Sequence, residues 1–578
     1  MKRFLSLLLA TILLLFALIS CGEATSPGGI NPQGTDAASD SPSGPATQPA
    51  TEPVTEPDTD LFAGSDPLPA DLSVPANIKT EDGSVLGTIV VPAGAEELLA
   101  YAGQELAYHV KKVTGSDLPV VSRTGDGYGS FIIATPESLP AVSEMFSDDL
   151  SWLADLGTKE TGKWAPDGFA IRLVGGNVWI LGNTARGALN GVYDLIEDNL
   201  GVLWVRADES KGLIFREMPE VTVSRVDYRE KSPFLMRGWM LCGVTGEPTN
   251  QILFSRNKLN AMNATPGYGM DYAGFGHTIK WLLTSSPAYD PNETEYWETD
   301  DEGNSLGLEG SHQVNPWSEK AAEVIAANII NQMQNSSKRF IFIGEEDAAP
   351  HLRCVPYDTE PFEYAPGQFV QPDAENYYST VMCTMINKIA RMVREAVPDG
   401  EVGAFAYNNA IVPPECEMED NVQICYAPWA EDLSLPILSQ KAKDKKGDYM
   451  ASNHCDWVRG WGEKSSHLYF WNYYICYESC TQYGWPIWYR IQQDLQDYAS
   501  MGVDGLIPEG EIDLETDCGL LDYWDEPGNH SNVWDQNMML YWLYSKLAWN
   551  PWEDIPTLIA YFCDSVYGDA SPYMQEYY

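Results

Sequence analysis

From Pro233 onward, short apolar runs alternate with longer segments in which apolar residues recur every three or four positions. The runs predict buried strands, and the longer segments predict amphipathic helices. We expect strands at residues 234–241, 259–264, 339–343, 402–407, 422–426, 467–471 and 503–507. We expect helices at residues 249–256, 317–333, 378–397, 485–501 and 532–549. One further strand within 274–283 would make eight, the number that closes a (β/α)8 TIM-like barrel over residues 230–578.

The preceding segment, residues 73–227, has a different pattern and predicts a smaller α+β accessory domain. Its expected strands are residues 88–91, 118–121, 130–134, 167–174 and 178–181. Gly175-Gly176 is the expected turn of a hairpin, and Gly115 is the expected C-terminal cap of a helix. The two expected helices are residues 95–113 and 184–199. No catalytic constellation is visible in this domain.

The N-terminus has the pattern of a targeting signal over residues 1–21. Lys2 and Arg3 precede an apolar run that stops at Ser20-Cys21. This arrangement resembles a bacterial lipobox, which implies that Cys21 is diacylated and becomes the mature N-terminus. An uncleaved transmembrane anchor is the alternative, although the run is short for a span of about 20 residues. Either alternative places the rest of the chain outside the cytoplasm, on the cell surface or the periplasmic face of a bacterial membrane.

Residues 22–72 are rich in Thr, Pro, Ser and Asp and contain no Lys or Arg. Such a segment is too polar to collapse, so we expect a disordered tether that holds the folded part away from the membrane. The formal net charge of −48 repels nucleic acid and anionic lipid, so we expect no nucleic-acid partner and membrane contact only through the lipid anchor. The chain ends at Tyr578 without a closing signal, which suggests that further C-terminal domains are missing.

Three carboxylates follow the strand expected at residues 339–343. They are Glu345, Glu346 and Asp347, placed directly after Gly344. In α/β barrels the loops after the strands carry the chemistry, and crowded carboxylates raise one another's pKa, as a general acid requires. A solvated acidic turn is the alternative. A third possibility is a metal site that includes His351, but the spacing matches no known loop such as the EF-hand.

Several enzyme and cofactor classes lack support in the sequence. The eleven cysteines show neither CxxC pairs nor Cys/His zinc spacing. No Gly-x-Ser-x-Gly elbow, P-loop or dinucleotide fingerprint is evident. We therefore expect no metal and no cofactor.

Two stretches resemble the accessory domain that precedes the barrel in bacterial β-N-acetylhexosaminidases and in α-glucuronidases. They are ELAYHVKKVTG, residues 105–115, and the segment from Asp167-Gly-Phe to RGALNGVYD, residues 186–194. The barrel resembles the domain-of-unknown-function family 4838. Its resemblance rests on residues 256–260, 276–278, 406–407, 413–414, 471–473, 501–505 and 546–551.

The resemblance implies a glycoside-hydrolase-like barrel. Gly344-Glu-Glu-Asp347 is similar to the Gly-Gly-Asp-Glu motif of hexosaminidases, which would make Glu346 the polarising acid and Asp347 the proton donor. Both positions differ from that motif in side-chain length. The family also shows a Cys-rich stretch after this acid, and here only Cys354 remains, with His351 nearby.

Glycoside hydrolysis needs one carboxylic acid to protonate the leaving oxygen and a second carboxylate as nucleophile or base. Glu509 and Glu511 follow the last expected strand and would face the first acid cluster across the barrel mouth. Glu509 is better placed because it is nearer the strand end. Solvation of the loop is the alternative for this pair.

Other polar and aromatic residues at expected strand ends are candidates for substrate binding. Arg237 could clamp a hydroxyl or carboxylate, or form a salt bridge at the core edge. His277 could bond a sugar hydroxyl or be structural. Tyr407, Trp471 and Tyr473 could stack on sugar rings.

The leading hypothesis is a surface-tethered glycoside hydrolase that acts on a poly- or oligosaccharide. Asp347 or Glu346 would be the acid and Glu509 its partner. The rival is a carbohydrate-binding lipoprotein that has lost catalysis, since binding needs only the aromatic platform. A structural or adhesive surface protein is the third hypothesis.

Overall fold

The computed structural model describes residues 74–578 except 125–126, 159–160, 243–247, 262–275, 348–351, 429–430, 444–448, 475–485 and 512–532. The described residues belong to one compact unit. The lipidation candidate Cys21 and the expected tether lie outside the described residues. Within the described part of the chain, no helix combines the length and the apolar character needed to cross a bilayer.

The accessory domain is built on a six-stranded mixed sheet. Across the sheet the order is β12 (Tyr228–Glu230), β7 (Phe169–Val174), β8 (Asn177–Gly182), β4 (Gly129–Ala134), β2 (Leu86–Val90) and β3 (Val120–Val121). The pairs β12–β7 and β7–β8 are antiparallel, and the remaining neighbours are parallel. A parallel pair, β1 (Ile78–Thr80) with β11 (Val221–Val223), brings the two ends of the domain together.

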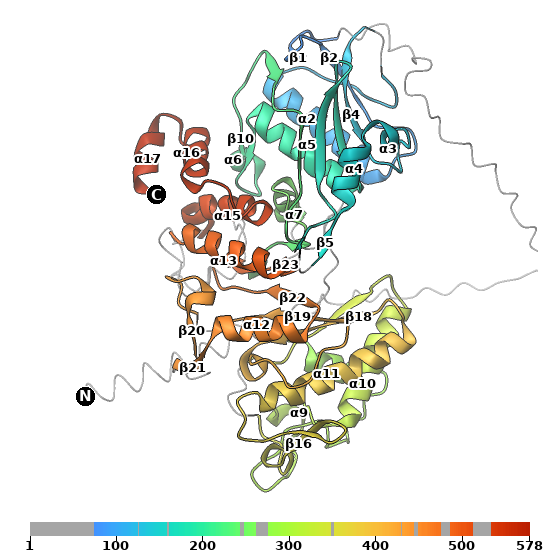
Figure 1. Cartoon of the computed structure of the whole chain (residues 1–578), viewed down its shortest axis with the longest axis vertical. Helices are drawn as coiled ribbons and strands as arrows, with labels where there is room; N and C mark the ends of the chain where they lie inside the picture. The colour runs from blue at the N-terminus through green and yellow to red at the C-terminus, as the bar shows by residue number, and fades with distance from the viewer. Residues whose placement is uncertain are drawn as a thin grey trace, which may run out of the picture. The chain divides into compact units, whose positions relative to one another are not determined.

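Both faces of this sheet are covered by helices. Alternate strand residues such as Phe131 and Ile133 pack under α2 (Glu97–Thr114) and α5 (Ala185–Leu200), which lie side by side (Figure 1). The intervening residues, such as Ile132, form a second cluster with residues of α3 (Val142–Met145) and α4 (Ser147–Ala154). The expected strands and helices of this domain are therefore confirmed.

Glycines in the left-handed region close two of these elements. Gly115 caps α2 with φ +75°, and its N–H donates to the carbonyl of Lys111. Gly175 and Gly176, with φ of +62° and +76°, turn the chain between β7 and β8. Only glycine adopts these angles readily, which is why the sequence predicted both turns.

The C-terminal region contains a six-stranded, wholly parallel sheet, called the parallel sheet below. Its order is β13 (Met236–Arg237), β23 (Gly505–Leu506), β22 (His467–Phe470), β19 (Val422–Tyr426), β18 (Glu401–Ala406) and β15 (Phe340–Ile343). The pair β13–β23 continues, beyond an interruption, as β14 (Met240–Cys242) beside β24 (Glu509–Glu511). These strands match six of the expected eight.

The segments expected to supply the second and third strands adjoin the two edges of this sheet. The N–H groups of Asn260 and Ala261 donate to the carbonyl of Arg237, and the N–H groups of Thr278 and Ile279 donate to that of Gly344. Residues 262–275 lie outside the described residues. The strand expected within 274–283 is not found in the described part of that range, where Ile279–Thr284 forms the helix α8. The described residues thus give a six-stranded parallel sheet, compatible with a barrel.

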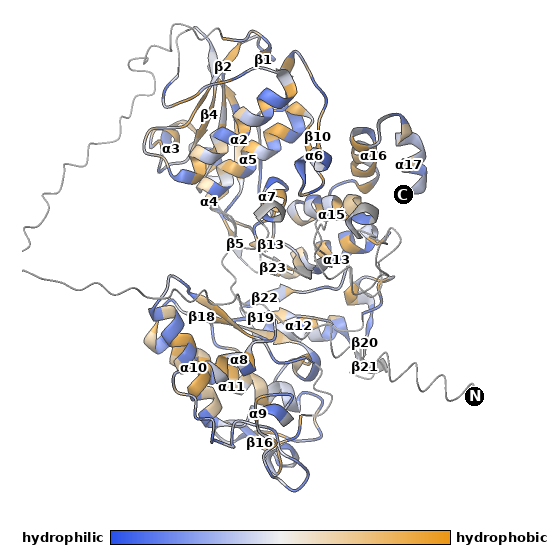
Figure 2. Ribbon diagram, turned by 180° about the vertical axis from the view of Figure 1, so that it is seen from behind, coloured by the Kyte–Doolittle hydropathy of each residue, from blue (hydrophilic) through white to orange (hydrophobic). Residues whose placement is uncertain are grey.

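Helices separate and cover these strands. They are α7 (Pro248–Arg256), α9 (Gly307–Gly310), α10 (Glu319–Gln334), α11 (Tyr377–Ala396), α12 (His454–Lys464), α13 (Trp488–Met501), α15 (Val533–Trp549), α16 (Ile555–Val566) and α17 (Ser571–Tyr577). Figure 2 shows hydrophobic and hydrophilic residues together on helices such as α10, as expected for helices buried on one side. Two antiparallel hairpins, β16 (Phe362–Ala365) with β17 (Gln368–Val370) and β20 (Lys441–Lys443) with β21 (Tyr449–Asn453), extend from the connections.

Candidate active site

The carboxyl edge of the parallel sheet, where its strands end, holds most of the predicted site residues. Alternate residues of the strands form an interior cluster that includes Phe342, Phe405, Tyr469 and Ile507. Tyr407 belongs to the same cluster, and Trp471 packs against it. Because strand side chains alternate between two faces, residues two positions after an interior residue point the same way. Tyr407, Trp471 and Glu509 each follow an interior residue at that spacing.

Asp347 and Tyr407 are joined directly. The Tyr407 hydroxyl donates a hydrogen bond of 2.8 Å to Oδ1 of Asp347. Tyr407 is 8% exposed, so its ring is fixed by packing while its hydroxyl reaches the loop after β15. The predicted acid therefore has a defined orientation.

His277 lies beside this pair. Its Nδ1 is 2.5 Å from the carbonyl oxygen of Glu345, and its ring centroid is 6.3 Å from that of Tyr407. A carbonyl oxygen only accepts, so Nδ1 carries the proton and donates. This bond sets the tautomer and leaves Nε2 as the ring nitrogen that can accept.

Glu346 is fixed through both its backbone and its side chain. Its N–H donates to Oε1 of Gln313 at 3.0 Å, and its carbonyl accepts from Nε2 of the same residue at 2.5 Å. Its carboxylate accepts the backbone N–H of Lys280 at 3.1 Å. Gln313 is 1% exposed and was not predicted, because a lone Gln in a long connection carries no sequence signal.

Glu509 and Tyr473 complete the edge. Glu509 is 7% exposed, and its N–H donates to the carbonyl of Asn472 at 2.7 Å. The pKa of the Tyr473 phenol is raised well above its usual value by burial and also by Tyr407, Glu509 and Asp347. The charges of both predicted catalytic carboxylates thus contribute to the raised pKa of this phenol.

Trp471 packs with its ring centroid 5.7 Å from that of Phe405, edge to face. Its indole Nε1 is buried and has no hydrogen-bond partner among the described residues. A buried N–H without an acceptor costs about 1–3 kcal/mol.

Arg237 is not a substrate clamp. It is fully buried, and its guanidinium donates to both carboxylate oxygens of Asp167, at 3.3 and 2.5 Å. It also donates to the carbonyls of Phe234 and Lys258. The alternative of a core salt bridge is therefore correct, and the arginine joins the parallel sheet to the accessory domain.

Glu345 also points away from the site. It continues the face of Ile341 and Ile343, which pack toward the helices, and it is 4% exposed. Its charge contributes to the raised pKa of the buried Cys383 thiol on α11, after burial itself and Cys416. Its predicted role in substrate binding is therefore wrong.

The remaining predicted residues have no described side chains. Glu511 is the last residue of β24, where its backbone pairs with Cys242, and its side chain lies outside the description. His351, of the alternative metal set, also lies outside. Among the described residues, no cluster of His, Cys, Asp and Glu has the arrangement of a metal site.

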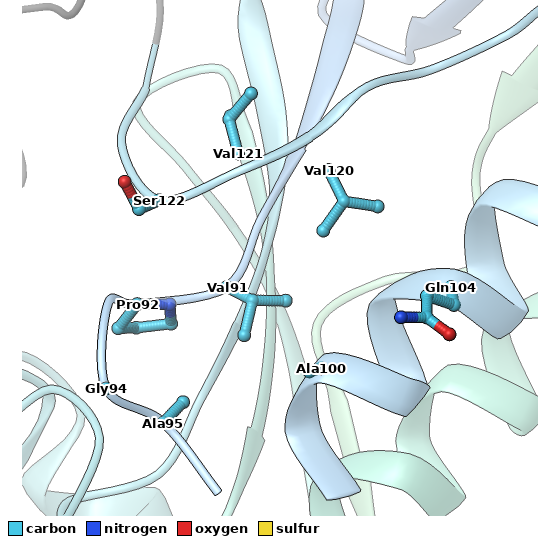
Figure 3. A pocket seen from close by; sticks show the side chains of 9 residues that line it. All are labelled: Val91, Pro92, Gly94, Ala95, Ala100, Gln104, Val120, Val121 and Ser122. Atoms are coloured by element: carbon cyan, nitrogen blue, oxygen red, sulfur yellow. The ribbon is translucent and has the colours of Figure 1, made fainter. Parts of the chain in front are cut away.

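A pocket of about 410 Å³ lies in the accessory domain, between the end of β2, the start of α2 and β3 (Figure 3). Val91 and Val120 point toward α2, which carries Gln104, whereas Val121 points away from it. None of its lining residues is acidic or basic. It therefore offers no acid–base chemistry, in contrast to the carboxyl edge of the parallel sheet.

Comparison with known protein families gives two matches. Residues 212–578 match the family described as "Domain of unknown function (DUF4838)". Residues 74–195 match the family described as "Glycosyl hydrolase family 67 N-terminus". Both matches confirm the resemblance found in the sequence. No curated protein matches the chain.

Solved structures similar to the chain include three glycoside hydrolases. A family GH138 enzyme that targets pectin rhamnogalacturonan II is 12% identical, with a TM-score of 0.40 over 84% of this chain and 67% of its own. A family GH115 4-O-methyl-α-glucuronidase with specificity for decorated arabinogalactans is 11% identical, with a TM-score of 0.44 over 85% of this chain and 61% of its own. The N-acetyl-β-hexosaminidase of Streptomyces plicatus is 13% identical, with a TM-score of 0.42 over 89% of this chain and 98% of its own. The chain thus spans less than two thirds of the α-glucuronidase.

Proposed function

The chain belongs to the family described as domain of unknown function DUF4838, and we propose that it is a glycoside hydrolase. Its substrate would be a poly- or oligosaccharide, cleaved by carboxylate acid–base catalysis. The observation that carries this proposal is that Asp347, bonded by the Tyr407 hydroxyl, and Glu509, bonded through its N–H to Asn472, both lie at the carboxyl edge of the parallel sheet. Two carboxylates that flank one space are what glycosidic cleavage requires.

Asp347 is the favoured proton donor. Its carboxylate is oriented by the Tyr407 hydroxyl, whereas the Glu346 carboxylate accepts the Lys280 N–H at the start of α8. Asp347 would protonate the glycosidic oxygen as the bond to the leaving group breaks. Glu509 would then act as nucleophile at the anomeric carbon, or as the base that activates a water.

The surrounding groups fit a sugar. The Trp471 indole N–H lacks an acceptor among the described residues, so a hydroxyl oxygen could supply one. Its ring and those of Tyr407 and Tyr473 offer faces for stacking. Nε2 of His277 could accept a hydrogen bond from a further hydroxyl, since Nδ1 is engaged by Glu345.

The test is a screen of the full chain, purified in detergent, on a panel of glycans and aryl glycosides. We expect Asp347→Asn and Glu509→Gln each to lower kcat/KM on the cleaved substrate by about 100-fold or more. Asp420→Asn is the matched control, because this exposed residue precedes β19 at the opposite end of the sheet. Wild-type activity in both site variants would disprove the site assignment.

The same aromatic edge would also serve a carbohydrate-binding protein without catalysis. The Trp471 indole has no acceptor in the described part of the chain. This observation concerns binding alone, so it supports a binding protein as well as it supports an enzyme. Calorimetry separates the two functions. Binding of a glycan that is lost in Trp471→Ala, with no turnover of any substrate by the wild type, would favour the binding protein.

We further propose that Cys21 is acylated and anchors the protein outside the cytoplasm. The support is the apolar segment that ends at Ser20-Cys21, followed by a segment without Lys or Arg. Radiolabelled palmitate should label the wild type in a bacterial host, and the label should be absent from Cys21→Ala. Equal labelling of both proteins would contradict the anchor.

A further inference from the structure

Behind the aromatic edge lies a buried cluster of two acids and one arginine, none of which was singled out in the sequence. Glu431 follows β19, while Arg490 and Asp494 lie one turn apart on α13. Arg490 forms an ion pair with Glu431 and lies 3.3 Å from Asp494 (Nε to Oδ2). The side chains of Glu431, Arg490 and Asp494 are 2%, 4% and 0% exposed, respectively.

Each acid of this cluster also holds a backbone N–H from the carboxyl edge of the sheet. Oε1 of Glu431 accepts the N–H of Tyr473 at 2.6 Å, and Oδ1 of Asp494 accepts the N–H of Ile437 at 2.7 Å. Asp494 accepts the Tyr474 hydroxyl as well, at 3.0 Å. The connection after β19 and the connection after β22 are therefore both attached to α13, through Arg490 by way of Glu431 and directly through Asp494.

We infer that Glu431 is a positioning residue: held by Arg490, it fixes the backbone of Tyr473 and thereby the position of its phenol at the carboxyl edge of the sheet. This inference rests on the proposed function. The hydrogen bond of Glu431 is to the backbone of Tyr473, so its effect on the reacting groups passes through that residue.

The geometry supports this role for two reasons. Tyr473 is one residue beyond Asn472, whose carbonyl accepts the N–H of Glu509, so Asn472 stays anchored when Glu431 is changed and the displacement falls on Tyr473. The cluster is also desolvated, and a charged acceptor in such surroundings binds an N–H strongly and directionally. Burial raises the pKa of Asp494 to about 7, with Arg490 opposing and Glu431 adding to the shift. The charges of the cluster therefore act on one another, and a change in one member affects the rest.

The kinetic test uses Glu431→Ala, which removes the acceptor, and Glu431→Gln, whose amide oxygen can still accept the Tyr473 N–H. We expect Glu431→Ala to lower kcat by about 100-fold with little change in KM, because misplacing a group by about 1 Å has this cost. Glu431→Gln should recover most of the loss. In a Tyr473→Phe background, Glu431→Ala should have little further effect, since the two changes act through one group.

Asp149→Asn in the accessory domain is the control for stability. Asp149 is 9% exposed at its side chain and pairs with Arg172 at 2.6 Å, so its loss also breaks a buried ion pair. We expect this variant to lose thermal stability while its kcat stays near that of the wild type. If Glu431→Ala lowers kcat equally in the presence and absence of the Tyr473 hydroxyl, the positioning role is overturned.

Crystal structures of the wild type and of Glu431→Ala provide a readout that does not depend on turnover. Displacement of the Tyr473 backbone in the variant supports the inference, and an unmoved Tyr473 overturns it. A wild-type protein that cleaves no substrate would overturn the proposed function alone, and the crystallographic comparison would still decide the role of Glu431.

Discussion

Two regions of this molecule are rich in carboxylates and hold them in opposite ways. Where the accessory domain meets the C-terminal region, buried acids of the former pair with buried bases of the latter. The ion pairs are Asp167–Arg237, Glu105–Arg256, Asp194–Lys258 and Glu197–Lys546. At the carboxyl edge of the parallel sheet, the carboxylate of Asp347 accepts from a phenol and that of Glu346 from a backbone N–H.

The difference separates acids that stabilise from acids that can react. A carboxylate paired with a fixed cation in a buried site is held in its ionised form. A carboxylate that accepts from a hydroxyl, as Asp347 does from Tyr407, can take up or release a proton without leaving a cation uncompensated. From the sequence, the base Arg237 was predicted at the reactive edge. The structure places it among the ion pairs that join the two regions.

Among the substitutions that test this comparison, Arg237→Met should have the largest effect. It leaves Asp167 buried without its cation, and breaking a buried pair in this way costs about 3–5 kcal/mol. We expect the free energy of unfolding, from urea titrations followed by fluorescence, to fall by that amount while the remaining folded protein keeps its kcat. A loss of activity at unchanged stability would return Arg237 to the site.

The buried His109 should make the free energy of unfolding depend on pH. Its ring is fully buried, with Nδ1 donating to the Glu105 carbonyl and Nε2 accepting from the Trp204 indole. Burial lowers the pKa of His109 from 6.5 to about 4. Between these values the unfolded chain binds a proton that the folded protein does not, so stability falls as the pH is lowered from about 6.5 to 4, by up to about 1.4 kcal/mol per pH unit.

The measurement is urea unfolding at pH 6.5, 5.5 and 4.5 for the wild type and His109→Gln. Other groups titrate in this range, so the difference between the two proteins carries the information. We expect the variant to lose less stability on acidification than the wild type. Parallel losses would show that His109 is protonated in the folded state.

Tyr407→Phe tests the carboxyl edge. It removes the hydroxyl that donates to Asp347 and keeps the packed ring. Hydrogen bonds to charged groups are worth about 1.5–3 kcal/mol, so we expect kcat on a cleaved glycoside to fall by at least about tenfold. Thermal unfolding should change little. An unchanged kcat would mean that Asp347 needs no orientation from this side.

Lys111→Ala should have the smallest effect. Its pair with Asp117 is 2.7 Å long, but the two side chains are 59% and 76% exposed. Exposed ion pairs of this kind contribute less than about 1 kcal/mol, so unfolding should shift by less than about 0.5 kcal/mol. A loss comparable to that of Arg237→Met would show that pairing, and not burial, distinguishes the interface.

The spacing of apolar residues predicted most helices and strands well, because it follows directly from which side of each one is buried. β19 has the predicted bounds, Val422–Tyr426, and α11 differs from its predicted range by one residue at each end. By contrast, α12 was missed, since only three of its four buried residues are apolar, Trp457, Val458 and Trp461, and Gly460 interrupts the pattern. The Ile279–Thr284 run was too short for its periodicity to distinguish a helix from a strand.

The side chains at strand ends were harder to place. A parallel strand is apolar on both faces, so the sequence does not reveal which of two neighbouring residues faces the interior. Phe340 and Phe342 proved to be interior, which puts Ile343 and Glu345 on the helix side. The positioning residue Glu431 and its partner Arg490 are 59 residues apart in the chain, and only the fold brings them together.

The shared core has a consequence for how such proteins diversify. One hydrophobic core runs from α2 and α5 into the C-terminal region, and Phe169 stacks on Trp549 across it. A recombination event that exchanged only the accessory domain would remove the carboxylates that pair with four buried cations of the C-terminal region. Substitutions in the loops at the carboxyl edge, by contrast, would leave this internal balance of charge untouched.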